Sequence, residues 1–355
     1  MEAAELTNRQ AMLLGLIVQE HVRTATPIAS RALVERYHLD VSSATVRNEM
    51  ARLEELGYLV QPHTSAGRIP TEQGFRYFVE RLMEEQTLPL SERRKIAHQF
   101  HQAQEHREQW MPLAASVLAR MTRSAAIVTA PRAVCAIYKH LELIATHGRA
   151  VLLVLVLEGG AVEQQMLVLP QIFSQGALSE IASRLNQICS GLTAEQIKQQ
   201  LQFLSSSEVD IARLLISLMA ARQDTPADSI YQHGLSRLLR EPEFAEGEVE
   251  SAGLIRVLEE QSLLQAVIAD GLGPSAGVGG VRVLIGGEGR WDALRACSVV
   301  LTRYGIANYA TGALGVLGPM RMAYGHTISA LRFVADVLSD MVYEMYQPGL
   351  EEVTK

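Results

Sequence analysis

The first 86 residues hold three helix-period apolar patterns followed at once by a short segment rich in Gly and Pro. This order restricts the fold more than any other feature of the chain. The first pattern places apolar residues on one helical face: Leu13, Leu14, Ile17 and Val18. Thr7, with Gln10 three residues later, forms a capping box that marks the start of this helix. Three helices followed by a two-stranded hairpin predict a winged helix-turn-helix, a fold that binds double-stranded DNA.

The second and third helical patterns have recognisable starts. We expect Pro27 in the first turn of the second helix, where proline is tolerated. The third helix is expected to start at Ser42 or Ser43, both good caps, and to end at Gly57. Its apolar stripe should face the other two helices and consists of Val46, Met50, Leu53 and Leu56.

The opposite face of the third helix is small, polar and cationic. At about 100° per residue this face carries Ala44, Thr45, Asn48 and Arg52, with Arg47 at its edge. Asn pairs with adenine and Arg with guanine in the major groove, and Ala leaves room for a thymine methyl. The hydroxyls and N–H groups of Ser42 and Ser43 suit phosphate. A solvated face of an ordinary three-helix core is the alternative interpretation.

The segment after Gly57 predicts the wing. Tyr58–Val60 reads as a short strand, Gln61–Gly67 as a polar turn and Arg68–Ile69 as the returning strand. His63 and Arg68 are its only potential cations, and we expect no acid to oppose them. The candidate DNA-contacting residues are therefore Ser42, Ser43, Ala44, Thr45, Arg47, Asn48, Arg52, His63, Thr64, Ser65, Gly67 and Arg68.

The charge balance is unusual for a DNA-binding domain. The whole chain has a formal net charge of −7. Residues 1–86 hold nine Arg and no Lys against twelve acidic residues, a balance of −3. A basic domain is the usual electrostatic footprint of nucleic-acid binding. Here the acid-free stretches 41–48 and 58–71 coincide with the predicted contacts, so we still expect DNA binding. Because one domain can neutralise only a few phosphates, we expect a shallow dependence of the affinity on salt.

The rest of the chain predicts two further regions of mixed structure. Three strands at 141–146, 150–157 and 162–169, joined by tight turns, indicate an antiparallel meander. Other expected strands are 125–129, 281–285, 297–304 and 311–317. The expected helices are 91–109, 111–122, 176–187, 193–202, 208–223, 229–240, 249–268 and 324–345.

Several long strings of this sequence resemble the HrcA family of heat-inducible transcription repressors. They are Ser42–Met50, Leu53–Leu59, Gln61–Thr71, and Gly315–Met322 followed by Tyr324. The resemblance implies an α+β, multidomain fold with an N-terminal winged helix-turn-helix at 1–86. It also implies a GAF-like α/β domain split into 87–136 and 225–355, interrupted by an inserted dimerisation domain at 137–224, a three-stranded antiparallel sheet with helices.

The same resemblance implies a function. Such repressors bind an inverted repeat called CIRCE upstream of chaperone operons as homodimers, and the GroEL chaperonin keeps them active. Heat diverts the chaperonin, the repressor loses activity and the operons are transcribed. A two-fold protein that reads two half-sites fits this target.

Other chemistry has little support in the sequence. Cys135, Cys189 and Cys297 lie far apart, and no residues have metal-ligand spacing. The glycines of 277–289 lack the spacing of phosphate-binding loops. We therefore expect no catalytic residues, metal or cofactor. A DNA-binding regulator gated by a small ligand in the GAF-like domain is the alternative, and an enzyme with a DNA-binding appendage is a third possibility.

The expected location is the cytoplasm. The longest purely apolar run, Ala150–Leu157, is far shorter than a membrane span, and no segment reads as a signal peptide. We therefore expect a soluble, intracellular protein.

Overall fold

The computed structural model describes residues 6–63, 66–84, 86–133, 136–158, 161–224, 229–245, 247–273, 277–307 and 309–353. These described residues have mixed α and β structure with three sheets, and the chain divides into two compact units. Unit 1 comprises Met1–Ala130, Ser229–Tyr304 and Ala313–Leu338, and unit 2 comprises Pro131–Asp228, Gly305–Gly312 and Ser339–Lys355. The three-domain division drawn from the sequence stays a prediction.

The N-terminal part of unit 1, residues 6–84, is called the head here. Its elements are α1 (Asn8–Thr24), α2 (Ser30–Tyr37), α3 (Ser43–Glu55), β1 (Leu59–Val60), β2 (Ile69–Pro70), α4 (Glu72–Tyr77) and a π-helical turn (Phe78–Leu82). The capping box of Thr7 and Gln10 starts α1. The head encloses a core of buried side chains: Leu13, Leu14, Ile17, Val18, Leu33, Val46, Met50, Leu53 and Phe75.

The expected position of Pro27 is wrong. The second helix begins at Ser30, and Pro27 lies in the extended segment before it. The reason is a backbone pairing, because Ile28 donates to and accepts from the backbone of Arg68, at 2.9 Å in both directions. This pairing holds the residues around Ile28 in an extended conformation.

The rest of unit 1, called the body, is built on a six-stranded sheet with the order β8-β3-β11-β10-β9 and with β4 paired to β11. The strands are β3 (Ala125–Thr129), β4 (Arg132–Ala133), β8 (Ile230–His233), β9 (Val281–Ile285), β10 (Cys297–Ile306) and β11 (Ala310–Pro319). β4 and the far ends of β10 and β11 belong to unit 2.

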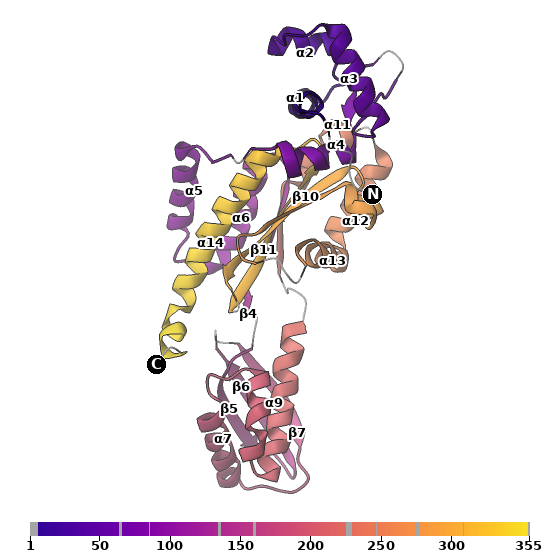
Figure 1. Ribbon diagram of the computed structural model, residues 1–355. Helices are drawn as coiled ribbons and strands as arrows, with labels where there is room; N and C mark the ends of the chain where they lie inside the picture. The colour runs from indigo at the N-terminus through magenta and orange to yellow at the C-terminus, as the bar shows by residue number, and fades with distance from the viewer. Residues whose placement is uncertain are drawn as a thin grey trace. The chain divides into compact units, whose positions relative to one another are not determined.

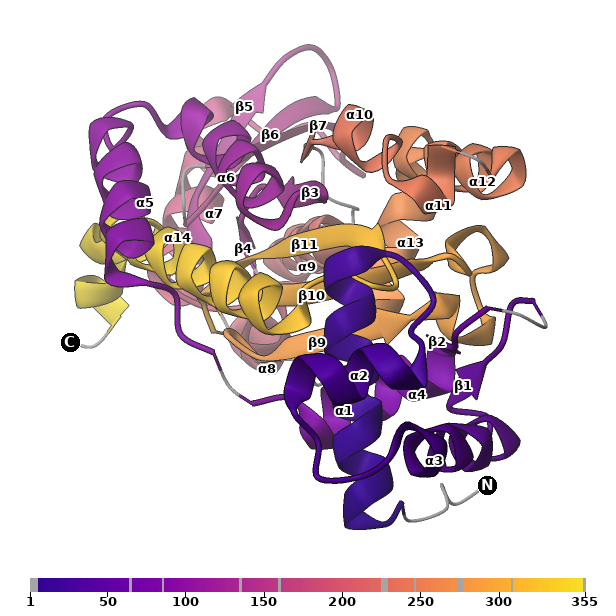
Figure 2. The same ribbon diagram turned by 90° about the horizontal axis from the view of Figure 1, so that it is seen from above.

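Helices lie against both faces of this sheet (Figures 1 and 2). The helices of the body are α5 (Leu90–Gln102), α6 (Arg107–Thr122), α10 (Leu235–Leu238), α11 (Pro242–Ala245), α12 (Glu248–Glu259), α13 (Gln261–Leu272) and α14 (Tyr324–Val353), with 3-10 turns at Gly286–Gly289 and Asp292–Leu294. Of these, α5 packs on α6 and α11 on α12.

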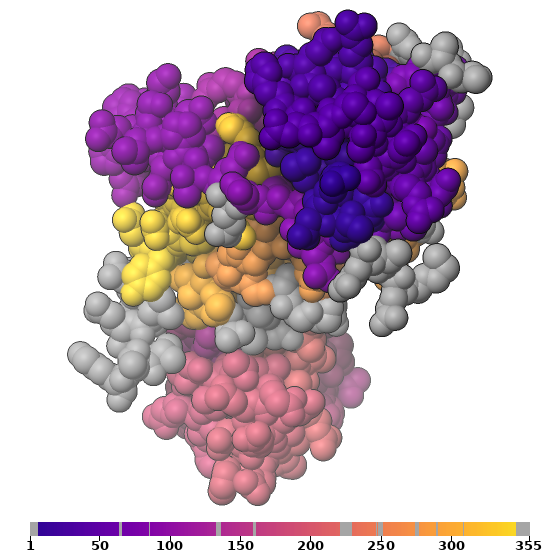
Figure 3. All heavy atoms as spheres, turned by 45° about the horizontal axis from the view of Figure 1, so that its top comes forward, coloured from indigo at the N-terminus to yellow at the C-terminus, as the bar shows by residue number. Residues whose placement is uncertain are grey.

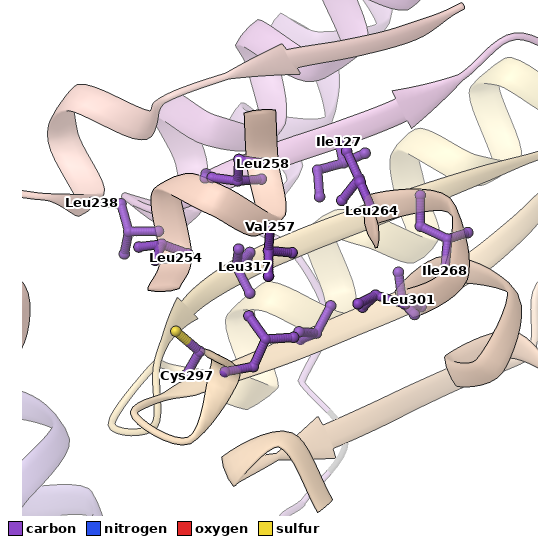
Figure 4. Close-up of a cluster of buried hydrophobic side chains, with 14 of the residues drawn as sticks. Ile127, Leu238, Leu254, Val257, Leu258, Leu264, Ile268, Cys297, Leu301 and Leu317 are labelled. Carbon is purple, nitrogen blue, oxygen red and sulfur yellow. The ribbon is translucent and has the colours of Figure 1, made fainter. Parts of the chain in front are cut away.

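Alternate residues of β10 point to opposite faces of the sheet, as the period of a strand requires. On one face Cys297 and Leu301 pack with leucines of α12 and α13 (Figure 4). On the other face the Ser298 hydroxyl lies 2.7 Å from the Tyr324 hydroxyl of α14. Tyr304, on that same face, donates its hydroxyl to the Thr129 carbonyl at 2.6 Å. The sheet therefore has a helical layer on each side.

Unit 2 contains the predicted meander, which is confirmed as a three-stranded antiparallel sheet. Its strands are β5 (Tyr138–Ala145), β6 (Ala150–Leu157) and β7 (Val162–Val168). The helices that follow are α7 (Gln175–Cys189), α8 (Ala194–Gln200) and α9 (Ser206–Asp224), with a 3-10 turn at Leu201–Phe203. One face of the sheet packs on these helices through Leu141, Leu143, Leu153, Leu155, Leu178, Leu185, Ile211 and Leu215.

Three other expected elements are wrong. The helix expected at 91–109 ends at Gln102, where the chain turns and the Ala103 carbonyl accepts the indole N–H of Trp110 at 3.0 Å. The helix expected at 229–240 starts instead as strand β8, which pairs with β3. The helix expected at 249–268 is two helices separated at Glu260, whose backbone is extended.

Cys189 and Cys297 are free and buried, and Cys135 lies outside the described residues. Within the described parts of the chain, no helix is both long and apolar enough to cross a membrane.

Candidate nucleic-acid interface

The start and the end of α3 are fixed by local hydrogen bonds. Ser42 is the N-cap, and its hydroxyl accepts the backbone N–H of Thr45 at 3.1 Å. The first turn contains no acidic residue, so its free N–H groups keep their positive potential. After Leu56 the chain turns at Gly57, whose φ of 83° lies in the left-handed region that favours glycine.

The two faces of α3 differ as the sequence predicts. Val46, Met50 and Leu53 are buried against the head core. Leu56 is an exception, because it caps the helix and is 38% exposed instead of joining the stripe. The opposite face is open: Ser42, Ser43, Ala44, Arg47, Asn48 and Arg52 are exposed and Thr45 is half-buried. Figure 3 shows the indigo atoms of the head at the surface.

The polar side chains of this open face differ in their partners. Arg52 forms an exposed ion pair with Glu55 at 3.5 Å. Among the described residues, neither the guanidinium of Arg47 nor the amide of Asn48 has a side-chain partner. These two groups can therefore bind a ligand without first giving up an internal contact.

The hairpin beside α3 is held by three backbone segments. β1 and β2 pair antiparallel, with Val60 opposite Ile69, and Ile28 extends the pairing through Arg68. Gly67 is required here, because a Cβ at this position would lie 2.4 Å from the carbonyl of Ile28. The sequence singles out Gly67 as a contact to DNA, and the structure gives it a packing role. His63 is exposed, and Thr64 and Ser65 lie outside the described residues.

Arg68 does not meet the expectation that no acid opposes the hairpin cations. Its Nε donates to Oε2 of Glu54 at 2.8 Å, and its side chain is only 14% exposed. Glu54 lies in the last turn of α3, fourteen residues before Arg68. Helix periodicity could not reveal this contact, because it depends on how the hairpin folds back on α3.

A cluster of charges fixes α1 against α2. The carboxylate of Glu20 accepts hydrogen bonds from Arg23 at 2.6 Å, from Arg36 at 3.1 Å and from Tyr37 at 3.3 Å. The hydrogen bond from Arg23 is the main cause that lowers the pKa of Glu20. At the other end of α1, Gln10 donates its amide to Glu49 of α3 at 3.1 Å. These contacts join α1 to both α2 and α3.

The head is also attached to the body of unit 1. Arg76 of α4 pairs with Glu72 at 2.8 Å and with Glu288 of the body at 3.4 Å. Phe75 lies beside Tyr324 at the start of α14, with 6.3 Å between the ring centroids. The loop that carries Glu288 is strained, since its φ is 49° in a residue other than glycine.

Comparison with known proteins gives consistent names. A family model described as "HrcA protein C terminal domain" matches residues 108–328. The "Heat-inducible transcription repressor HrcA" of Roseiflexus castenholzii is 43% identical, over 98% of this chain and 97% of that protein. The protein of the same name from Chloroflexus aurantiacus is 41% identical, over 96% of this chain and 95% of that protein.

A solved structure described as that of "a hypothetical protein" has the same fold. Its TM-score is 0.56 at 24% sequence identity, and the match covers 96% of this chain and 100% of that one.

Proposed function

The chain belongs to the HrcA family of heat-inducible transcription repressors, and we propose that it represses chaperone operons by binding a CIRCE-type inverted repeat as a dimer. The family is one of transcription repressors and not of enzymes, and a transcription repressor binds DNA. The proposal adds the operator, the oligomeric state, and the dependence on GroEL and temperature. It also adds the domain types, a winged helix-turn-helix at 1–86 and a GAF-like domain interrupted by 137–224, and a cytoplasmic location.

The open face of α3 carries the DNA-binding part of the proposal. Arg47 and Asn48 are exposed there without side-chain partners among the described residues, at the N-terminal half of a helix capped by Ser42. A helix of this kind enters the major groove with its first turns toward the base edges. Arg47 and Asn48 then read bases, while Ser42 and Ser43 meet phosphate. The pairing of Ile28 with Arg68 holds the hairpin strands beside α3, and in this arrangement His63 meets the DNA backbone beside the groove.

Binding to an inverted-repeat duplex tests this assignment. Arg47→Ala or Asn48→Ala should each weaken operator binding by about 1–3 kcal/mol per site and relax the preference at one base pair. Arg295→Ala is the matched control, because Arg295 is an exposed arginine of the body that pairs only with nearby Asp292 among the described residues. If either α3 variant keeps the native preference between base pairs, the substituted residue does not contact bases.

The outer face of the three-stranded sheet supports the dimer. Leu152 of β6 lies between Ile144 of β5 and Met166 of β7, on the face opposite the helices. The exposed fractions of Val162, Met166 and Val168 on that face are 50%, 53% and 74%. Exposed apolar side chains gathered on one face are typical of an interface. A second copy of the chain is the occupant we propose, because an inverted repeat needs two heads related by a two-fold axis.

The dimer has its own test. Met166→Lys puts a charge on the apolar face, and we expect monomers in analytical ultracentrifugation together with weaker binding to the full inverted repeat. Binding to a single half-site should stay unchanged, because the head is intact. Gln187→Lys places the same charge on an exposed position of α7 and should remain dimeric. If the Met166→Lys variant remains dimeric, the dimer interface lies on another surface of the chain.

The chaperonin dependence rests on the family alone. A footprint of the purified protein on a chaperone-operon promoter, with and without GroEL across temperature, tests it. We expect protection of the inverted repeat that is strengthened by the chaperonin and lost on heating. Protection that is indifferent to chaperonin at every temperature would exclude this form of control.

A further inference from the structure

Two acidic residues at the end of α3 face two arginines of the proposed DNA interface. Glu55 pairs with Arg52 at 3.5 Å, and both side chains are about two-thirds exposed, at 67% and 70%. Exposed pairs of this kind contribute little and are readily exchanged. Glu54 pairs with Arg68 at 2.8 Å, where the side chains are only 34% and 14% exposed. The second pair is therefore the one held in place.

The backbone around this pair keeps the arginine where it is. Arg68 exchanges two backbone hydrogen bonds with Ile28, and Gly67 lies against the Ile28 carbonyl. Glu54 is fixed on the other side by α3, whose stripe is buried in the head core. Arg68 therefore presents its charge to solvent only together with the carboxylate of Glu54.

We propose that Glu54 masks the charge of Arg68 and thereby lowers affinity for DNA of any sequence, which makes Glu54 a specificity-determining residue of the interface. This inference rests on the proposed function, since it needs α3 and the hairpin to meet DNA. Nonspecific affinity comes from cations that neutralise phosphates and release counterions. A masked arginine adds nothing to that term, whereas the base contacts of Arg47 and Asn48 are untouched. Specificity is the difference between the two affinities, so it rises when nonspecific binding falls.

The magnitude follows from counterion release. One unmasked arginine per head adds one phosphate contact, which steepens the log–log dependence of affinity on salt by about 0.9. At roughly 0.1 M salt the same contact raises nonspecific affinity by about eightfold for each head that touches DNA. A purely structural role for Glu54 predicts the opposite, because a loosened hairpin weakens binding to every duplex.

The decisive variant is Glu54→Gln, which removes the charge and keeps an oxygen that can accept the Arg68 Nε–H. The full-length protein is titrated over a salt series with two duplexes, the inverted repeat and a random sequence of equal length. We expect random-duplex affinity to rise several-fold, with a steeper salt slope and a lower ratio of specific to nonspecific binding. Glu54→Asp keeps the charge and should keep the native slope. Glu259→Gln makes the same charge change at an exposed position of α12 and should alter neither duplex.

A double variant distinguishes two cases: the Glu54–Arg68 pair stays closed when the protein binds DNA, or it opens and Arg68 binds phosphate. Glu54→Gln combined with Arg68→Gln has the net charge of the masked pair, so its slope should return to the native value. A slope flatter than native would show that Arg68 leaves Glu54 to bind phosphate, and would overturn the inference. Unchanged random-duplex binding in Glu54→Gln, or equal losses on both duplexes, would overturn it as well. Failure of the native protein to prefer the inverted repeat would instead refute the proposed function itself.

Discussion

Replacement of Gly67 by alanine should loosen the hairpin without unfolding the head. The added Cβ would lie 2.4 Å from both the carbon and the oxygen of the Ile28 carbonyl, and those atoms belong to backbone that cannot rotate away. Relief requires Ile28 and Arg68 to separate, which breaks the two hydrogen bonds of 2.9 Å between them. At about 1 kcal/mol for each bond, the local cost is roughly 2 kcal/mol.

Hydrogen exchange measures this cost at the residues concerned. A loss of about 2 kcal/mol should reduce protection of the Ile28 and Arg68 amides roughly thirtyfold, since 1.4 kcal/mol corresponds to a factor of ten. Protection in the core of α1 should hold, because none of its contacts change. Gly176→Ala is the matched control: nothing lies within 4 Å of a Cβ at Gly176, in the first turn of α7. Native protection of Ile28 in Gly67→Ala would refute the steric argument.

Three further predictions concern charge and reactivity. The pKa of Glu20 is held below its ordinary value of 4.5, chiefly by the hydrogen bond from Arg23. The contribution of Glu20 to stability is therefore present above pH 4.5 and is lost as the pH falls through the lowered pKa. Acid unfolding followed by circular dichroism should show a weaker pH dependence in Glu20→Gln, and identical curves for the variant and the native protein would contradict this role of Glu20. Burial raises the pKa of Cys189 to about 11 and of Cys297 to about 12, so both thiols should resist alkylation at mildly alkaline pH until the chain is unfolded, and rapid labelling of the native protein would contradict this. Because Arg68 is held in a pair with Glu54, the native protein should show a shallower salt slope on its operator than a strongly basic repressor does, and a slope as steep as that of such a repressor would be inconsistent with the pairing.

Local signals in the sequence predicted a large part of the fold. The strand Ala150–Leu157 has the predicted bounds, because an unbroken apolar run between turn residues leaves few alternatives. Ser42 caps α3 as its hydroxyl suggests, and the apolar stripe of that helix is buried up to Leu53. These features depend on residues within one or two turns of each other, which is the range over which periodicity and capping act.

Long-range contacts account for what the sequence did not predict. Ile230–His233 is a strand because β3, about a hundred residues earlier, offers it a free edge. Glu54 meets Arg68 only after the hairpin has folded back on α3, and Gly67 is needed because Ile28 approaches it from another segment. In each case the two partners are too far apart in the sequence for residue spacing to indicate their contact. The candidate interface was therefore predictable in its helix and less so in its hairpin.

The contact between Phe75 and Tyr324 has a consequence for the order of synthesis. About 250 residues separate the two rings, and a ribosome adding roughly 5–20 residues per second needs about 12 to 50 s to reach the second one. During that interval the nascent head lacks the aromatic contact with α14, although its own helices have been synthesised. An unfinished polypeptide therefore carries a head that still lacks its contact with α14, and this contact can form only when translation is almost over.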